Sequence, residues 1–133
     1  MGLQGKILIV EDDESLSLLY SAELSDEGYE CLLAKNGKEA IRVLTEVRPD
    51  LIILDIVMPV MDGMEVLGRI IGKYRHIPII LHSSHQGYKE DFMSWSADAY
   101  VIKSSNLTEL KAKIRDLLDK KKKAEESGFP QRR

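Results

Sequence analysis

The segment Leu51–Pro59, LIILDIVMP, determines how the rest of the chain is interpreted. Its four leading apolar residues run directly into a carboxylate, which is typical of a strand buried on both faces of a parallel sheet. Pro59 cannot donate a ladder hydrogen bond and disfavours helix at the residue before it, so the strand must give way to a loop near Asp55. Open α/β sheets place their chemistry at the carboxyl ends of strands, and Asp55 is therefore a candidate functional residue. The alternative is a loop residue that merely follows a strand.

The composition is that of one globular domain. The chain has 133 residues, of which 44% are hydrophobic, enough for a sizeable core. A formal net charge of -3 gives no general reason to expect nucleic acid or an anionic membrane as a partner. The single cysteine, Cys31, excludes an internal disulfide and favours a reducing compartment. No apolar run has the length of a signal peptide core or a membrane span, so a cytoplasmic location is expected.

Buried-strand patterns alternate with helical patterns along the whole chain. Besides the central strand, strands are expected at residues 6–10, 29–34, 77–81 and 99–102. This alternation predicts an α/β fold in three layers, a doubly wound five-stranded parallel sheet with the flavodoxin-like order 2-1-3-4-5. A single domain is expected over residues 1–120, and the polar residues 121–133 are expected to form a disordered tail.

In that strand order, residues suited to metal or phosphate chemistry meet at one end of the sheet: Glu11, Asp12, Asp55, Ser83 and Lys103. Three neighbouring carboxylates repel one another unless they keep protons or a cation balances them. Such hard oxygen ligands suit Mg²⁺, which keeps several waters and bridges to phosphate. A carboxylate can be the nucleophile of a phosphoryl transfer, and a lysine and a hydroxyl can contact phosphate oxygens. Each residue alone also has an ordinary explanation, as a helix-start acid, a turn serine or a surface lysine.

Taken together, the motifs closely resemble the receiver domain of two-component response regulators. The resemblance covers residues 5–119 and rests on four motifs: Val10–Glu14 (VEDDE), Asp55–Pro59 (DIVMP) with Asp62-Gly63, Ser83-Ser84, and Tyr100–Lys103 (YVIK).

The resemblance implies that Asp55 is the phosphoacceptor. It also implies that Glu11, Asp12 and Asp55 hold Mg²⁺, with the backbone carbonyl of Val57 as a further ligand. The domain would then be a signalling module, and its only catalysis would be its own phosphorylation and dephosphorylation at Asp55.

The resemblance further implies that Ser83 and Lys103 contact the phosphoryl group and that Ser83 and Tyr100 take part in the switch. The phosphoryl donor would be a phosphohistidine on a sensor histidine kinase or a histidine phosphotransfer protein. A face formed by the fourth helix, the fifth strand and the fifth helix would control a downstream effector or an output domain that the sequence does not identify.

Two other functions are considered. A haloacid-dehalogenase-like phosphohydrolase also uses an Asp nucleophile with Mg²⁺, but Asp55-Ile56-Val57 lacks that family's second Asp. A flavin-binding domain would need a phosphate-cradling first loop, whereas the acidic run 11–14 would repel phosphate. His82 is expected to face the core. Ser104 stands where receivers usually have proline, so a trans Lys103–Ser104 bond is expected.

Overall fold

The computed structural model describes residues 4–55, 68–70, 72–74, 76–84 and 97–127. The strands and helices within these ranges are β1 (Gly5–Val10), α1 (Glu14–Asp26), β2 (Tyr29–Ala34), α2 (Gly37–Glu46), β3 (Leu51–Leu54), β4 (Ile79–Ser83), β5 (Ala99–Ile102) and α5 (Thr108–Ser127). Residues 68–70 and 72–73 are also helical. The helix of the expected output face that precedes β5 would lie outside the described residues.

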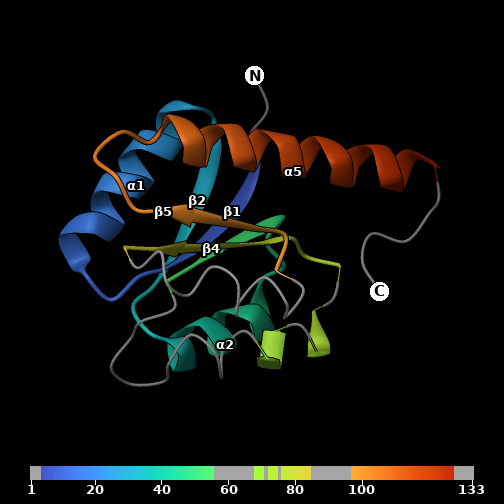
Figure 1. Cartoon of the computed structure of the whole chain (residues 1–133). Coiled ribbons are helices and arrows are strands. Elements are labelled where there is room, and N and C mark those ends of the chain that lie inside the picture. The colour runs from blue at the N-terminus through green and yellow to red at the C-terminus, as the bar shows by residue number, and fades with distance from the viewer. Residues whose placement is uncertain (1–3, 56–67, 71, 75, 85–96, 128–133) are drawn as a thin grey trace.

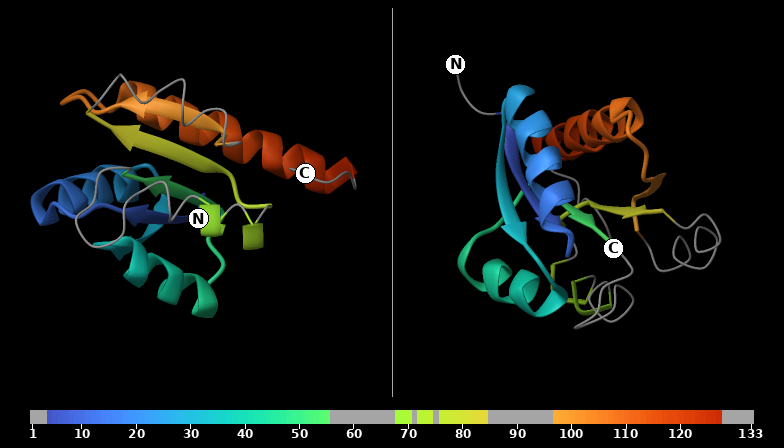
Figure 2. Two further views of the ribbon diagram at one scale, coloured as in Figure 1. Left: turned by 60° about the horizontal axis from the view of Figure 1, so that its bottom comes forward. Right: turned by 90° about the vertical axis from the view of Figure 1, so that its left-hand side faces the viewer.

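The strands form one parallel sheet in the order β2-β1-β3-β4-β5, as predicted. The register pairs Val10 with Leu54, Leu54 with Leu81, and Ser83 with Ile102. The carboxyl ends of four neighbouring strands therefore lie at one edge of the sheet. Helices α1 and α5 cover one face of the sheet and α2 lies on the other, which gives the three layers (Figures 1 and 2).

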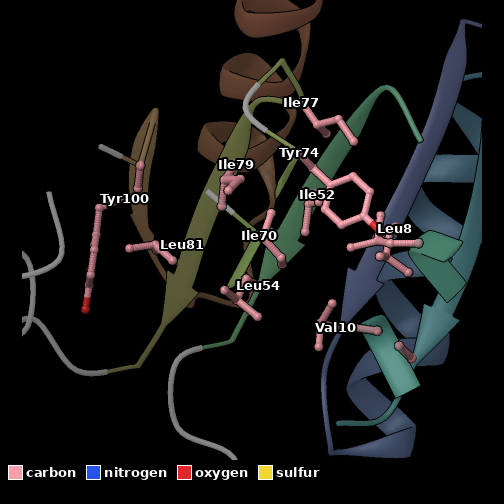
Figure 3. Packing of buried hydrophobic residues seen from close by; sticks show 14 residues of the cluster. Leu8, Val10, Ile52, Leu54, Ile70, Tyr74, Ile77, Ile79, Leu81 and Tyr100 are labelled. Atoms are coloured by element: carbon pink, nitrogen blue, oxygen red, sulfur yellow. The ribbon is translucent and has the colours of Figure 1, made fainter. Parts of the chain in front are cut away.

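Alternate residues along each strand contribute to two separate cores. On the α2 face, the buried cluster includes Leu8, Val10, Ile52, Leu54, Ile79, Leu81 and Tyr100 (Figure 3). On the face covered by α1 and α5, here called the α1/α5 face, the cluster includes Ile7, Ile9, Tyr20, Leu24, Leu51, Ile53, Ile80 and Val101. Burial on both faces explains why the strands read as continuous apolar runs.

Side chains of the connecting loops fix where the first two helices begin and end. The Asp13 carboxylate accepts a hydrogen bond from the Leu16 N–H at 3.0 Å and caps α1. The Asn36 side chain accepts from the Glu39 N–H at 2.8 Å and caps α2 in the same way. Gly28 follows the end of α1 with a φ of +98°, a conformation that favours glycine.

The last helix is longer than the sequence predicted. Helix α5 continues to Ser127, so the prediction of a disordered tail is wrong for residues 121–127, and residues 128–133 lie outside the described part of the chain. Lys121 is only 9% exposed, and its Nζ lies 3.3 Å from Asp50 Oδ1 at the amino edge of the sheet. The other oxygen of Asp50 accepts the Lys6 N–H at 2.8 Å. This contact ties the polar end of α5 to the sheet.

The Lys103–Ser104 peptide bond is trans, as predicted, and so is every other peptide bond among the described residues. A membrane span needs a long apolar helix, and the helices of the described ranges include none.

Candidate functional site

The register of the sheet brings the predicted residues together. The Asp55 N–H donates to the Val10 carbonyl at 3.0 Å, which places Asp55 next to the start of the acidic run after β1. The Lys103 N–H donates to the Ser83 carbonyl at 2.7 Å, which continues the β4–β5 ladder by one residue. The ends of β1, β3, β4 and β5 therefore each contribute one or more side chains to the same edge.

Three carboxylates form the centre of the site. Each of Glu11, Asp12 and Asp55 contributes one carboxylate oxygen, and these three atoms lie within 4.8 Å of one another. Glu11 and Asp55 are 3% and 5% exposed, whereas Asp12 faces solvent. The second oxygen of Glu11 accepts the Asp13 N–H at 3.2 Å, which fixes the orientation of its carboxylate. A cluster of hard oxygen atoms, partly open to water, fits the ligand preference of Mg²⁺.

Lys103 bridges two of these carboxylates. Its Nζ lies 2.7 Å from Glu11 Oε1 and 3.1 Å from Asp55 Oδ2, and its side chain is 16% exposed. The ammonium therefore neutralises part of the negative charge at the site. Such a flexible point charge can exchange a carboxylate partner for a phosphate oxygen without rebuilding the fold.

The same contacts shift the pKa values of the bridging groups. Burial raises the pKa of the Glu11 carboxyl above its usual range, although the Lys103 ammonium and the Asp13 N–H oppose the shift. Burial acts to lower the pKa of Lys103, but the hydrogen bond to Glu11 and the charge of Asp55 outweigh it and raise that pKa. Lys103 is therefore protonated at neutral pH, and the buried Glu11 carboxyl is a weaker acid than an exposed glutamate.

Ser83 lies at this edge, and Tyr100 lies two residues before the end of the neighbouring strand β5. Ser83 ends β4 and is 1% exposed, and Tyr100 in β5 is 6% exposed. Tyr100 is paired with Leu81 and belongs to the cluster on the α2 face, where the two side chains lie side by side (Figure 3). Val57, the remaining predicted ligand, lies outside the described residues.

A cavity opens beside the carboxylates, between α1, β2 and the start of α2. Its volume is about 240 Å³, and its lining includes Glu11, Asp12, Leu18, Leu33 and Lys35. Leu18 and Leu33 are 57% and 39% exposed, more than most large apolar side chains among the described residues. The acidic site is thus open to the outside on the α1 side.

Sequence reasoning missed one part of the site. His82 is 2% exposed, as predicted, but its ring lies against Tyr20 of α1, with ring centroids 5.1 Å apart. Burial and the nearby Lys103 lower the pKa of His82 to about 4, so the imidazole is neutral. The sequence pattern makes no prediction of a site role for Tyr20. The available signal was the polar residue His82 within an otherwise apolar strand, directly before Ser83.

Fold and site define a doubly wound α/β domain with an acidic site at the carboxyl edge of its parallel sheet. A family profile described as the response regulator receiver domain matches residues 7–115. The chain belongs to this family of receiver domains.

Known relatives agree with this assignment. The response regulator MprA of Mycobacterium tuberculosis is 34% identical over 119 residues, which cover 88% of this chain and 52% of that protein. The chain spans about half the length of the curated relatives it matches.

Solved structures show the same fold. The response regulator TrrA of Thermotoga maritima, in complex with Mg²⁺-BeF, is 42% identical with a TM-score of 0.80, over 87% of this chain and 98% of that chain. TrrA in complex with the histidine kinase ThkA gives a TM-score of 0.78 at the same identity, over 87% of this chain and 97% of that chain.

Proposed function

We propose that this receiver domain accepts a phosphoryl group on Asp55 and that Lys103 and Ser83 contact the transferred group. The observation that carries the proposal is the Lys103 ammonium, 3.1 Å from Asp55 Oδ2 and 2.7 Å from Glu11 Oε1. A buried carboxylate beside a mobile cation is suited to become an acyl phosphate, because the added negative charge already has a counterion. The buried hydroxyl of Ser83 can donate a hydrogen bond to the same group.

In the transfer step, an oxygen of Asp55 attacks phosphorus and the bond from phosphorus to the donor nitrogen or oxygen breaks. Lys103 then exchanges a carboxylate contact for a phosphoryl oxygen and remains charged throughout. Attack of water on the phosphorus later releases inorganic phosphate and restores the Asp55 carboxylate. The domain is therefore no metabolic enzyme, and it catalyses only these two steps at its own Asp55.

The proposed metal ligands are Glu11, Asp12 and Asp55, with the carbonyl of Val57 as a fourth group. Support comes from the three carboxylates within 4.8 Å and from the Mg²⁺-BeF complex of the relative TrrA. Bound Mg²⁺ would offset the repulsion among the carboxylates and supply positive charge for the transferred phosphoryl group.

The proposed donor is a phosphohistidine on a sensor histidine kinase or a histidine phosphotransfer protein. The complex of TrrA with the histidine kinase ThkA supports this, as does the open α1 side of the acidic site.

We propose that Ser83 and Tyr100 transmit the structural change caused by phosphorylation towards β5 and α5, where an effector or output domain responds. The receiver unit was predicted to end at residue 120, and we propose that it extends to Ser127, where α5 ends. We also propose that it acts in the cytoplasm.

Incubation with Mg²⁺ and acetyl phosphate tests the proposal, with intact mass as the measurement. One added phosphoryl group is expected, and Asp55→Asn should abolish it. Asp50→Asn is the matched control, because Asp50 lies at the opposite edge of the sheet and contacts Lys6 and Lys121. Unchanged phosphorylation of Asp55→Asn would contradict the proposal. Multiple turnover of a small phosphate ester, lost in Asp55→Asn, would instead favour a phosphohydrolase.

A further inference from the structure

Two polar aromatic rings lie on the buried side of the charged site. Tyr20 of α1 is 3% exposed and His82 of β4 is 2% exposed. Their ring centroids are 5.1 Å apart, with an interplanar angle of 57°. Most of the α1/α5 face is otherwise aliphatic, so a pair of polar rings at this position calls for an explanation.

Strand parity places the two rings and Lys103 on the same face of the sheet. His82 is paired with Val101, a residue of the α1/α5 face. Lys103 follows two residues later and stays in the ladder through its N–H bond to Ser83, so its side chain leaves the sheet on the same face. Glu11 likewise follows Ile9 on that face, so the charged groups and the two rings share one side of the sheet.

The charges of the site act on both rings. Burial and then the Lys103 ammonium lower the pKa of His82. Burial raises the pKa of Tyr20, which is also affected by Lys103, Glu11, Asp55 and Asp13. Both rings are consequently neutral at physiological pH.

Packing alone does not account for His82. Within the described part of the chain, the ring contacts Tyr20 and has no hydrogen bond that would satisfy its nitrogens. A buried polar group without such a partner lowers stability, and an aliphatic residue would fill the space at less cost.

We propose that Tyr20 and His82 are positioning residues that form an uncharged aromatic floor under Lys103 and hold its ammonium against Glu11 and Asp55. This inference rests on the proposed function. The ammonium has three N–H groups, and two of them reach carboxylates. A carboxylate in the floor would hold Lys103 back from a phosphoryl group, and a cation would repel it. The neutral rings of Tyr20 and His82 neither bind the Lys103 ammonium tightly nor repel it. The ammonium therefore stays beside the carboxylates and can still turn towards a phosphoryl group.

The rate of phosphorylation by acetyl phosphate at saturating Mg²⁺ tests the floor. His82→Leu removes the ring nitrogens, His82→Gln keeps a neutral polar group, and Ile80→Val is the control on the same strand and face. Each variant is also made in a Lys103→Gln background, and melting temperatures are measured in parallel. His82→Leu should slow phosphorylation by about three- to tenfold, at the modest end of coupling within one network. The melting temperature of His82→Leu should equal or exceed that of the wild type. His82→Gln should be phosphorylated faster than His82→Leu but more slowly than the wild type.

The effect of His82→Leu should disappear in the Lys103→Gln background, because the floor acts through Lys103. Equal slowing in both backgrounds, or a wild-type rate in His82→Leu, overturns the inference while leaving the proposed function intact. If His82→Leu does not fold, Tyr20→Leu probes the floor from α1 and is judged by the same results. A wild-type chain that takes up no phosphoryl group overturns the proposed function and this inference with it.

Discussion

Lys103 Nζ lies 2.7 Å from Glu11 Oε1, although 92 positions separate the two residues in the chain. The sheet order makes this contact possible, because it gathers the carboxyl ends of β1, β3, β4 and β5 at one edge. In the resting state, the ammonium holds two of the carboxylates that a metal ion would use.

Removal of Lys103 should therefore lower the stability of the metal-free protein and increase the stabilisation that Mg²⁺ provides. Lys103→Met leaves Glu11 and Asp55 buried without their counterion, so the metal-free protein should lose roughly 3 kcal/mol of unfolding free energy. Mg²⁺ should restore more stability to this variant than to the wild type, because the competing cation is gone. Melting curves with and without Mg²⁺ measure both effects, and a smaller Mg²⁺-induced gain in the variant would contradict this competition.

Asp12 should matter for metal binding more than for the fold, because it faces solvent. In the wild type, Mg²⁺ at a hundred times its dissociation constant should add about 2.7 kcal/mol to the unfolding free energy. Asp12→Asn should reduce this gain and should stabilise the metal-free protein slightly by relieving repulsion. Asp26→Asn, at the far end of α1, is the control. Equal metal-induced shifts in wild type and Asp12→Asn would show that the metal binds elsewhere.

The buried imidazole of His82 should make the protein sensitive to acid. The ordinary pKa of histidine, 6.5, is lowered to about 4 in the fold. The unfolded chain therefore binds more protons than the folded one between these values, and stability present above pH 6.5 is lost as the pH falls towards 4. The size of this loss is roughly 3 kcal/mol.

The comparison of His82→Leu with wild type isolates this contribution. The pKa of Glu11 is raised, which acts in the opposite direction, and this term is common to both proteins. Denaturant titrations from pH 7 to pH 4 should show a flatter profile for His82→Leu. Ile80→Val, a change of a non-titrating residue on the same strand and face, should keep the wild-type slope. Parallel profiles for wild type and His82→Leu would mean that His82 titrates normally.

The contact between Lys121 and Asp50 should stabilise the extended end of α5. Lys121→Ala should cost about 1 kcal/mol, through its buried stem and its bond to Asp50 at 3.3 Å. The neighbouring Lys122 is exposed, and Lys122→Ala should change stability by less than about 0.5 kcal/mol. Urea titrations compare the two, and equal costs would show that the tie between helix and sheet contributes nothing.

The strand-end residues could be predicted from the sequence because two simple rules located them. A buried parallel strand reads as an apolar run, and function lies where that run meets a polar residue. Both rules apply to Asp55, to Glu11 and to Lys103, and the structure brings these three side chains into contact.

Other features depend on tertiary contacts that no local pattern encodes. Residues 121–127 show almost no apolar periodicity. Their helix is anchored to the sheet by the hydrogen bond from Lys121 to Asp50, a residue 71 positions away in the chain. The pairing of Tyr20 with His82 follows from how α1 packs on β4. The burial of His82 could therefore be predicted, whereas its neighbour could not.

The identity of the phosphorylated residue tests the account most directly. The protein is incubated with Mg²⁺ and acetyl phosphate, the acyl phosphate is reduced with borohydride to homoserine, and peptides are mapped by mass spectrometry. Homoserine at position 55 alone, and none in the Asp55→Asn protein, is the predicted result. Homoserine at Asp12 or at another aspartate of the wild type, with Asp55 unmodified, would contradict the assignment of Asp55 as the phosphoacceptor.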